Sequence, residues 1–304
     1  MAKSKRSTLD STTTSNLDQY GHSINYAISQ IFNAALSDKI HQKTGEESIR
    51  SLIYKYHLYP SGQEWDLVLG LEIAYNYLKK YYRCEYVYKN EIANQLLLQY
   101  HDDNSATLLR EVNSGGSIAD VVIVNGSTTA YEIKTELDSF DRLESQITAY
   151  QYLFDFVYVV TYPKALAYLN KMLPASIGII IFDNDGVLKC VKKPLKQIEN
   201  FDPSKAGLTL RQSELMKAYK NIHKKLPLMG TALIHMFCYK WYLELNASKA
   251  RSVFKTALKA RKPSKHQFDL IKNCSTSLKM LFLSKGFSKR YCIETLNKLY
   301  LVNN

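Results

Sequence analysis

The sequence predicts a mixed α/β protein in which a strand-rich segment lies between two helical regions. Short β-branched runs alternate with helical periodicity over residues 87–206, whereas residues 21–86 show helical periodicity and residues 207–304 contain basic helical patterns without a convincing strand. We therefore predict four parts: a flexible head at 1–20, an N-terminal helical region, a central α/β domain and a basic C-terminal helical region.

The composition is that of a globular protein. The chain has 304 residues, of which 46% are hydrophobic and 22% charged, so it can bury a core without disulfides, and collagen-like or wholly disordered chains are excluded. Its five cysteines form no C-x-x-C pair, which argues against structural zinc and fits a reducing cytosol. The apolar stretch at residues 226–245 contains charged residues, so we expect a buried core helix there, no membrane contact and a cytoplasmic protein.

The helical regions follow from periodicity and from helix breakers. Apolar residues at helical spacing begin at Ile24, and a second helical stretch runs over residues 64–82. Pro60 and Gly62 separate the two. Breaks near Pro227, Pro263 and Gly286 divide the C-terminal region into several helices.

The central segment changes period repeatedly. Its expected helices are 89–100, 139–154 and 164–173, and its expected strands are 107–112, 118–124, 128–135, 156–162, 177–182 and 187–191. Asn125-Gly126 is a strong hairpin signal between the second and third of these strands. The order is thus helix, three-stranded meander, helix, strand, helix and strand.

Two acids and a lysine stand on this hairpin. Asp120 lies on its first strand, and Glu132 and Lys134 lie two residues apart on its second, which places them on one face. Converging carboxylates suit Mg²⁺ or Mn²⁺, and a lysine beside them can oppose charge developing on a phosphate. This combination is typical of metal-assisted phosphodiester hydrolysis.

The hairpin loop decides whether these side chains can meet. With a two-residue loop, Asp120 would oppose Tyr131 and face away from Glu132. With Asn125-Gly126-Ser127 as the loop, Val124 opposes Thr128 and Asp120 opposes Glu132. We therefore predict the three-residue loop or an equivalent bulge.

Asp120, eleven residues, then Glu132-Ile133-Lys134, within this order of elements, resembles the PD-(D/E)XK nuclease superfamily, which has the restriction-endonuclease-like fold. Gln146-Ile-Thr-Ala-Tyr150 on the next helix is similar to the Q-x-x-x-Y element of its RecB-like members. The amino-acid sequence around Glu132 also resembles that of a group of small, poorly characterised bacterial proteins of that superfamily. One departure is that Ile118-Ala119 stand where the family's proline would precede the aspartate. The resemblance covers about residues 87–162.

The resemblance implies roles for individual residues. Asp120 and Glu132 would bind the metal together with the backbone carbonyl of Ile133, and Lys134 would be the catalytic lysine. Glu91 would add a further acid from the first helix. Gln146 and Tyr150 would orient the site or touch nucleic acid.

Structural interpretations of the same residues remain open. Glu132 and Lys134 can form a plain salt bridge on a strand, and Tyr150 lies in the apolar stripe of its helix, where packing alone accounts for it. Glu91 can stabilise a helix dipole instead of binding a metal.

The charge distribution indicates a polyanionic partner. Residues 1–204 carry a net charge of −4, and residues 205–304, with 20 Lys and Arg against four Asp and Glu, carry +16. We expect a helix with apolar residues inward and cations outward that contacts phosphates, built on Lys249, Arg251, Lys255, Lys259, Arg261, Lys262 and Lys265. A membrane surface or a protein–protein helix bundle are the alternatives.

The sequence thus favours an Mg²⁺- or Mn²⁺-dependent nuclease that cuts DNA rather than RNA, and the resemblance implies a setting in phage defence, restriction or a mobile element. The alternative is a non-catalytic nucleic-acid-binding module on a nuclease-like scaffold. A homo-oligomer or a protein partner is compatible with either function.

Overall fold

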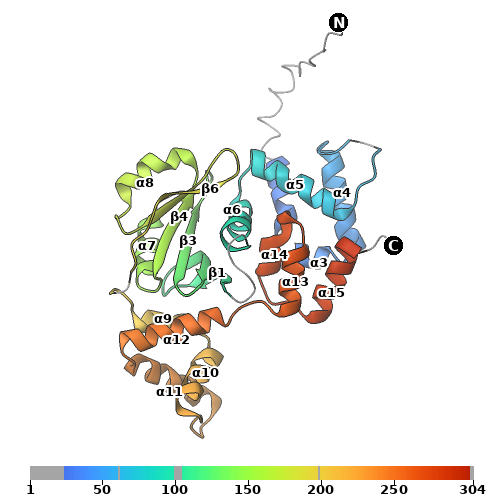
Figure 1. Ribbon diagram of the computed structural model, residues 1–304. Helices are drawn as coiled ribbons and strands as arrows, with labels where there is room; N and C mark the ends of the chain where they lie inside the picture. Colours follow the sequence, from blue (N-terminus) through green and yellow to red (C-terminus); the bar gives the residue numbers. More distant parts are fainter. Residues whose placement is uncertain (1–23, 61, 99–104, 198, 302–304) are drawn as a thin grey trace. The chain divides into compact units, whose positions relative to one another are not determined.

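The computed structural model describes residues 24–60, 62–98, 105–197 and 199–301 (Figure 1). The chain divides into two compact units, Met1–Tyr82 and Arg83–Asn304. The flexible head predicted at 1–20 lies outside the described residues.

The first unit is helical, as its periodicity predicts. Its elements are a helix over 24–29, η1 (Gln30–Phe32), α3 (Leu36–Lys39), α4 (Lys43–Lys55) and α5 (Leu67–Tyr81). Asp66 caps α5, because its side chain accepts a hydrogen bond from the Leu69 N–H at 2.7 Å. Ile53 of α4 and Leu71 of α5 are fully buried, so their apolar stripes form the core of this unit.

The second unit contains a six-stranded mixed sheet in the order β1-β2-β3-β4-β5-β6. Its first three strands form an antiparallel meander, β3, β4 and β5 run parallel, and β6 returns antiparallel to β5. The strands are β1 (Thr107–Asn113), β2 (Ile118–Val124), β3 (Thr128–Lys134), β4 (Phe156–Thr161), β5 (Gly178–Phe182) and β6 (Leu188–Lys192). The mixed α/β prediction is confirmed, and each predicted strand forms within two residues of its expected start and end.

Helices connect the parallel strands. α7 (Leu143–Gln151) joins β3 to β4, and η3 (Pro163–Ala165) with α8 (Leu166–Met172) joins β4 to β5, as Figure 1 shows. α7 begins later than the predicted start at 139. The segment before it forms a turn in which Asp138 Oδ2 accepts hydrogen bonds from the N–H and hydroxyl of Thr135, each at 2.8 Å.

The helix before the sheet also begins elsewhere than predicted. α6 (Glu85–Glu91) starts four residues before the expected residue 89 and continues as the π-helix η2 (Ile92–Leu98). The buried Asn90 joins it to the C-terminal helices, because its side chain donates to Thr276 O at 2.7 Å and accepts from Met280 N at 2.9 Å. These contacts with distant residues hold α6 at this position, and they override the local helix propensity of its residues.

The region after residue 200 is helical, as predicted. It contains α9 (Pro203–Thr209), α10 (Gln212–His223), α11 (Thr231–Glu244), α12 (Ala247–Lys259), α13 (Lys265–Asn273), η4 (Thr276–Leu278), α14 (Lys279–Leu283), α15 (Lys289–Leu296) and η5 (Asn297–Leu301). Asn246 and Ser264 cap α12 and α13 through their side chains.

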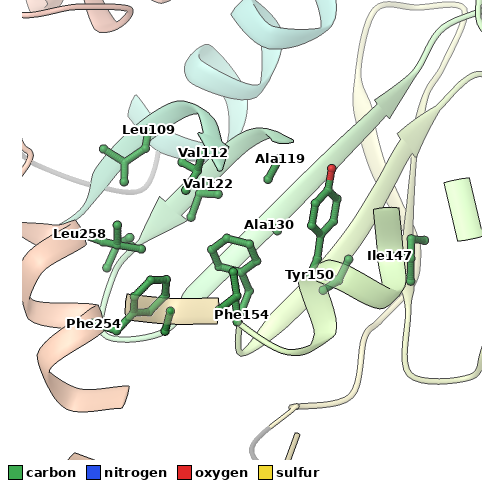
Figure 2. Close-up of a cluster of buried hydrophobic side chains, with 14 of the residues drawn as sticks. Leu109, Val112, Ala119, Val122, Ala130, Ile147, Tyr150, Phe154, Phe254 and Leu258 are labelled. Carbon is green, nitrogen blue, oxygen red and sulfur yellow. The ribbon is translucent and has the colours of Figure 1, made fainter. Parts of the chain in front are cut away.

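One apolar cluster joins the sheet to α7 and α12. Figure 2 shows Tyr150 and Phe154 from the α7 segment beside Ala130 of β3, with Phe254 and Leu258 of α12 at the other side of the cluster. All five side chains are buried. The sheet, α7 and the C-terminal helices therefore share one hydrophobic core, and α7 packs against β2 and β4.

The helix expected to be buried is partly exposed. α11 covers the apolar stretch, and Cys238 and Tyr242 on it are buried, but Leu233 and Met236 are more than half exposed. The prediction of a core helix is wrong because apolar content alone does not reveal which face finds a neighbour. In the described residues, no helix is long and apolar enough to cross a membrane.

Candidate functional site

The β2–β3 hairpin has the predicted three-residue loop. Val124 pairs with Thr128 and Val121 pairs with Tyr131, and Asn125 N donates to Ser127 O at 3.0 Å. Gly126 has a φ of 100°, in the region that favours glycine. This register confirms the predicted loop. The paired residues end at Val121 and Tyr131, and Asp120 and Glu132 are the next residue of each strand.

Asp120 is attached directly to the neighbouring strand. Its Oδ2 accepts a hydrogen bond from the Ile133 N–H at 2.8 Å. In an extended strand, the N–H and C=O of one residue point to the same side. The carbonyl of Ile133 therefore faces the strand that carries Asp120.

Glu132 is the centre of a buried polar network. Its Oε2 accepts from the Tyr150 hydroxyl at 2.7 Å, and its Oε1 lies 3.3 Å from Lys134 Nζ. Lys134 Nζ also donates to Gln146 Oε1 at 2.9 Å. The side chains of Glu132 and Lys134 are only 2% and 7% exposed, so α7 and β3 hold the carboxylate and the cation in fixed positions away from bulk water.

Tyr150 has both a packing role and a polar role. Its ring is buried in the apolar cluster, and its hydroxyl oxygen lies away from the labelled apolar side chains in Figure 2. That hydroxyl is 2.7 Å from Ile118 O as well as from Glu132. Burial raises the pKa of Tyr150, so the hydroxyl stays a donor to Glu132.

The two carboxyl groups lack a full complement of positive charge. Burial, followed by repulsion from Glu132, raises the pKa of Asp120 to about 7. Burial also raises the pKa of Glu132, against the hydrogen bond from Tyr150 and the charge of Lys134. A cation placed between the two acids would relieve this repulsion.

Among the described residues, no third acidic side chain joins the pair in a metal-holding group. Glu91, the last residue of α6, is 4% exposed, and its Oε2 accepts from Gln95 Nε2 at 2.5 Å. In the parts of the chain that the structure describes, no group of three His, Cys, Asp or Glu side chains could hold a metal ion. The Glu91 ligand role stays a prediction, and its interpretation as a first-turn helix acid is wrong because α6 ends there.

The sequence profile of the Bacteriophage P4 protein cII family matches residues 79–299, most of the chain. The chain belongs to this family. Protein cII of Enterobacteria phage P4 is 32% identical over 84 residues, which are 27% of this chain and 32% of that protein. The chain thus spans about a third of the length of this curated relative. No solved structure matches the chain.

Membership in the cII family corrects the assignment to the PD-(D/E)XK superfamily. The cII match includes the whole segment, residues 87–162, whose motif carried that resemblance, and it extends to the C-terminal helices. The assignment is wrong because Asp120, Glu132 and Lys134 are a short pattern of common residues, and such a pattern is shared by chains of different families.

Lys89 is a charged neighbour of the site that the sequence did not reveal. It is 5% exposed, and its Nζ lies 2.5 Å from Glu85 Oε1 and 3.3 Å from Glu111 Oε1. Its positive charge lowers the pKa of Asp120, against the larger effects of burial and Glu132. A lysine on a helix next to a glutamate at i−4 has the pattern of a surface pair, so no local signal marks it as buried.

The basic run of this cII-family chain does not face outward throughout. Arg251 of α12 forms a salt bridge with the fully buried Asp155, and Arg261 contacts Glu214 through two hydrogen bonds of 2.7 Å. The prediction that these two arginines lie on an outer, phosphate-binding face is therefore wrong. Lys255 is half-buried, and the exposed members of the run are Lys249, Lys259, Lys262 and Lys265.

Proposed function

We propose that this chain is a metal-dependent nuclease that hydrolyses phosphodiester bonds, in DNA rather than RNA. The observation that carries the proposal is the meeting of Asp120 and Glu132 on one face of the hairpin, with Lys134 Nζ 3.3 Å from Glu132. Hard oxygen ligands beside a positioned cation are what this chemistry requires.

The donor set fits Mg²⁺ or Mn²⁺. Asp120 and Glu132 would hold the ion, with the Ile133 carbonyl on the same side, and the raised pKa of Asp120 supports a missing positive charge there. With only two acidic side chains, water and phosphate oxygens would complete the ligand set, as is usual for Mg²⁺. When bound, such an ion polarises a phosphoryl oxygen and makes bound water more acidic.

The remaining side chains of the site would neutralise charge on the phosphate and hold the charged groups in position. Lys134 would oppose negative charge on the attacked phosphate, and Gln146 Oε1 restrains its ammonium group at 2.9 Å. Tyr150 orients Glu132 through its hydroxyl and excludes water with its buried ring. The chain's own residues thus supply binding, orientation and charge.

The arrangement of elements supports a finer statement about architecture. A helix, a three-stranded meander, a helix and a parallel strand follow one another in α6, β1 to β3, α7 and β4. We infer a restriction-endonuclease-like core from this order. The inference concerns the shape of the core within the cII family, and kinship with a phage protein favours a mobile-element or phage-defence setting.

One observation favours a second candidate, a non-catalytic nucleic-acid-binding module. Glu132, Lys134, Gln146 and Tyr150 form a network whose members are hydrogen-bonded or ion-paired without a metal. A buried network of this kind also contributes to a unique fold. Asp120 is not part of this network. The nuclease requires Asp120 as a metal ligand, whereas the binding module does not require it.

The test compares wild type with Asp120→Asn and, as a matched control, Asp141→Asn, which changes an exposed aspartate after the meander. Each protein is incubated with single- and double-stranded DNA and RNA in Mg²⁺, Mn²⁺ or EDTA. We expect metal-dependent cleavage of DNA by wild type and Asp141→Asn, and none by Asp120→Asn. Cleavage that persists in EDTA or in Asp120→Asn would contradict the proposal, and binding without cleavage or metal uptake would support the second candidate.

A further inference from the structure

A polar cavity of about 520 Å³ runs along the edge strand β1. Its walls come from β1, the α9–α10 turn, the α12–α13 turn and the loop after α14. Six of its sixteen lining residues are charged, and the single carboxylate of Glu111 stands against five cations, Arg110, Arg211, Arg261, Lys262 and Lys285. We call this cavity the β1 groove.

The cations of the β1 groove differ in how they are already engaged. Arg261 is paired with Glu214, and Arg110 Nη2 lies 2.7 Å from Glu111 Oε1. Arg211 and Lys285 are exposed, and within the described ranges neither has an ion-pair partner. Arg110 Nε is buried without a hydrogen-bond partner among the described residues. Two cations from different segments of the lining and one arginine donor are therefore available to a ligand.

The β1 groove lies next to the proposed catalytic site. Arg110 of β1 pairs with Val121 of β2, and Val112 pairs with Ala119. Asp120 lies between these two pairs, so the strand that lines the groove is the direct neighbour of the strand that carries Asp120. Neighbouring strands are about 5 Å apart. An anionic chain lying along β1 would thus pass one strand away from Asp120.

We propose that the β1 groove binds the sugar-phosphate backbone of a single nucleic-acid strand and leads it to the carboxylate site. The excess of cations selects a polyanion, and a volume of about 520 Å³ is that of a small-ligand pocket, which suits one backbone strand and not a duplex. The edge of β1 offers backbone groups to a peptide strand as well, but the exposed cations Arg211 and Lys285 favour phosphates over backbone pairing. The inference rests on the proposed nuclease function for the fate of its ligand, and binding itself needs no cleavage.

The experiment measures fluorescence anisotropy of a labelled single-stranded DNA oligonucleotide in EDTA over a range of salt concentrations. It compares wild type with Arg211→Ala/Lys285→Ala. The matched control, Lys171→Ala/Lys289→Ala, removes the same charge from exposed lysines that line neither the β1 groove nor the basic run of α12 and α13. A charge-conserving Arg211→Lys/Lys285→Arg variant and thermal unfolding of all four proteins separate lost binding from lost folding.

We expect the groove variant to bind at least about tenfold more weakly at low salt, and its slope of log K against log salt to fall by about 1.4, for two lost contacts to a single strand. The control should change affinity by less than about twofold and the charge-conserving variant should recover most of the binding. Equal losses in the groove and control variants would overturn the proposal, as would displacement of the oligonucleotide by an acidic peptide at equal charge concentration.

The outcome is independent of the nuclease assay. If the groove variant loses binding while wild type cuts nothing, the groove assignment stands and the nuclease fails. If wild type cuts DNA and the groove variant binds and cuts equally well, the groove assignment fails and the nuclease stands.

Discussion

At the scale of single residues, the site is organised by the environment of two carboxyl groups. Asp120 and Glu132 share burial but differ in their partners, because Glu132 has Tyr150 and Lys134 while Asp120 has the backbone N–H of Ile133. Burying a carboxyl group whose charge is poorly compensated lowers the stability of the fold, and groups of this kind are concentrated at functional sites. Two predictions follow from this difference.

The first concerns the Tyr150 hydroxyl. Tyr150→Phe keeps the ring but leaves the buried Glu132 Oε2 without its hydroxyl donor, so we expect a loss of about 1–3 kcal/mol in the free energy of unfolding. We also expect Mn²⁺ affinity to fall about tenfold or more, because a group that orients a ligand is lost. Thermal unfolding and Mn²⁺ titration measure both effects.

Tyr242→Phe is the matched control for this change. It removes another buried tyrosine hydroxyl, which donates to Ala250 O at 3.0 Å away from the acids. We expect a loss of stability of the same order and unchanged Mn²⁺ affinity. Equal Mn²⁺ affinity in Tyr150→Phe and wild type would contradict the orienting role of Tyr150.

The second prediction concerns pH. The pKa of Asp120 is about 7 in the folded chain and 3.8 as an ordinary aspartate. The protonated carboxyl therefore stabilises the folded state at low pH, and this contribution is lost as pH rises from about 4 through about 7. Without metal, Asp120→Asn should be more stable than wild type at pH 8, by between about 1 and 4 kcal/mol.

At pH 3.5 the same comparison should give nearly equal stabilities, since the carboxyl is then neutral in the folded state and mostly protonated in the unfolded state. Urea unfolding of both proteins at the two pH values, with EDTA, measures the difference. A constant gap across this range would show that Asp120 does not titrate as its surroundings require. Asp141→Asn, at an exposed position, should show no such pH dependence.

At the scale of elements, α12 is joined to the sheet by a buried ion pair. Arg251 of α12 reaches Asp155, which accepts a hydrogen bond from Thr128 N at 2.8 Å and precedes β4. Asp155 N in turn donates to Thr128 Oγ1 at 2.9 Å. One aspartate thus connects the start of β3, the start of β4 and the C-terminal helices.

Breaking this pair on one side should be costly. Asp155→Ala leaves the Arg251 guanidinium buried without its partner, so we expect a loss of about 3–5 kcal/mol in the free energy of unfolding. The double variant Asp155→Leu/Arg251→Met removes both charges and should lose less than Asp155→Ala alone. Urea unfolding measures both, and a loss in the double variant as large as that in Asp155→Ala, or larger, would show that Arg251 does not depend on Asp155.

The elements themselves were largely predictable, because they depend on local patterns. Alternation and the Asn125-Gly126 turn placed the hairpin and its register, and through them Asp120 opposite Glu132. The start of α6 and the inward direction of Arg251 were not predictable. Both depend on partners far along the chain, such as Thr276 for Asn90 and Asp155 for Arg251, and a local pattern contains no information about them.

At the scale of the whole molecule, the positive charge of the C-terminal region has two uses. Part of it is structural, in the pairs that Arg251 and Arg261 form. Much of the rest is exposed, and Arg211 and Lys285 lie at the β1 groove. A net charge of +16 in residues 205–304 predicts a polyanionic partner, but it does not predict which cations lie on the surface, because that depends on how the helices pack.

Calorimetric titration of Mn²⁺ measures directly whether Asp120 and Glu132 form the proposed metal site. The proteins are wild type, Asp120→Asn, Glu132→Gln and Glu91→Gln, all at pH 8, where the carboxyl of Asp120 is ionised. We predict binding to wild type, retained in Glu91→Gln and lost in Asp120→Asn and Glu132→Gln. Absence of binding to folded wild type, or binding that survives in Asp120→Asn, would contradict the account.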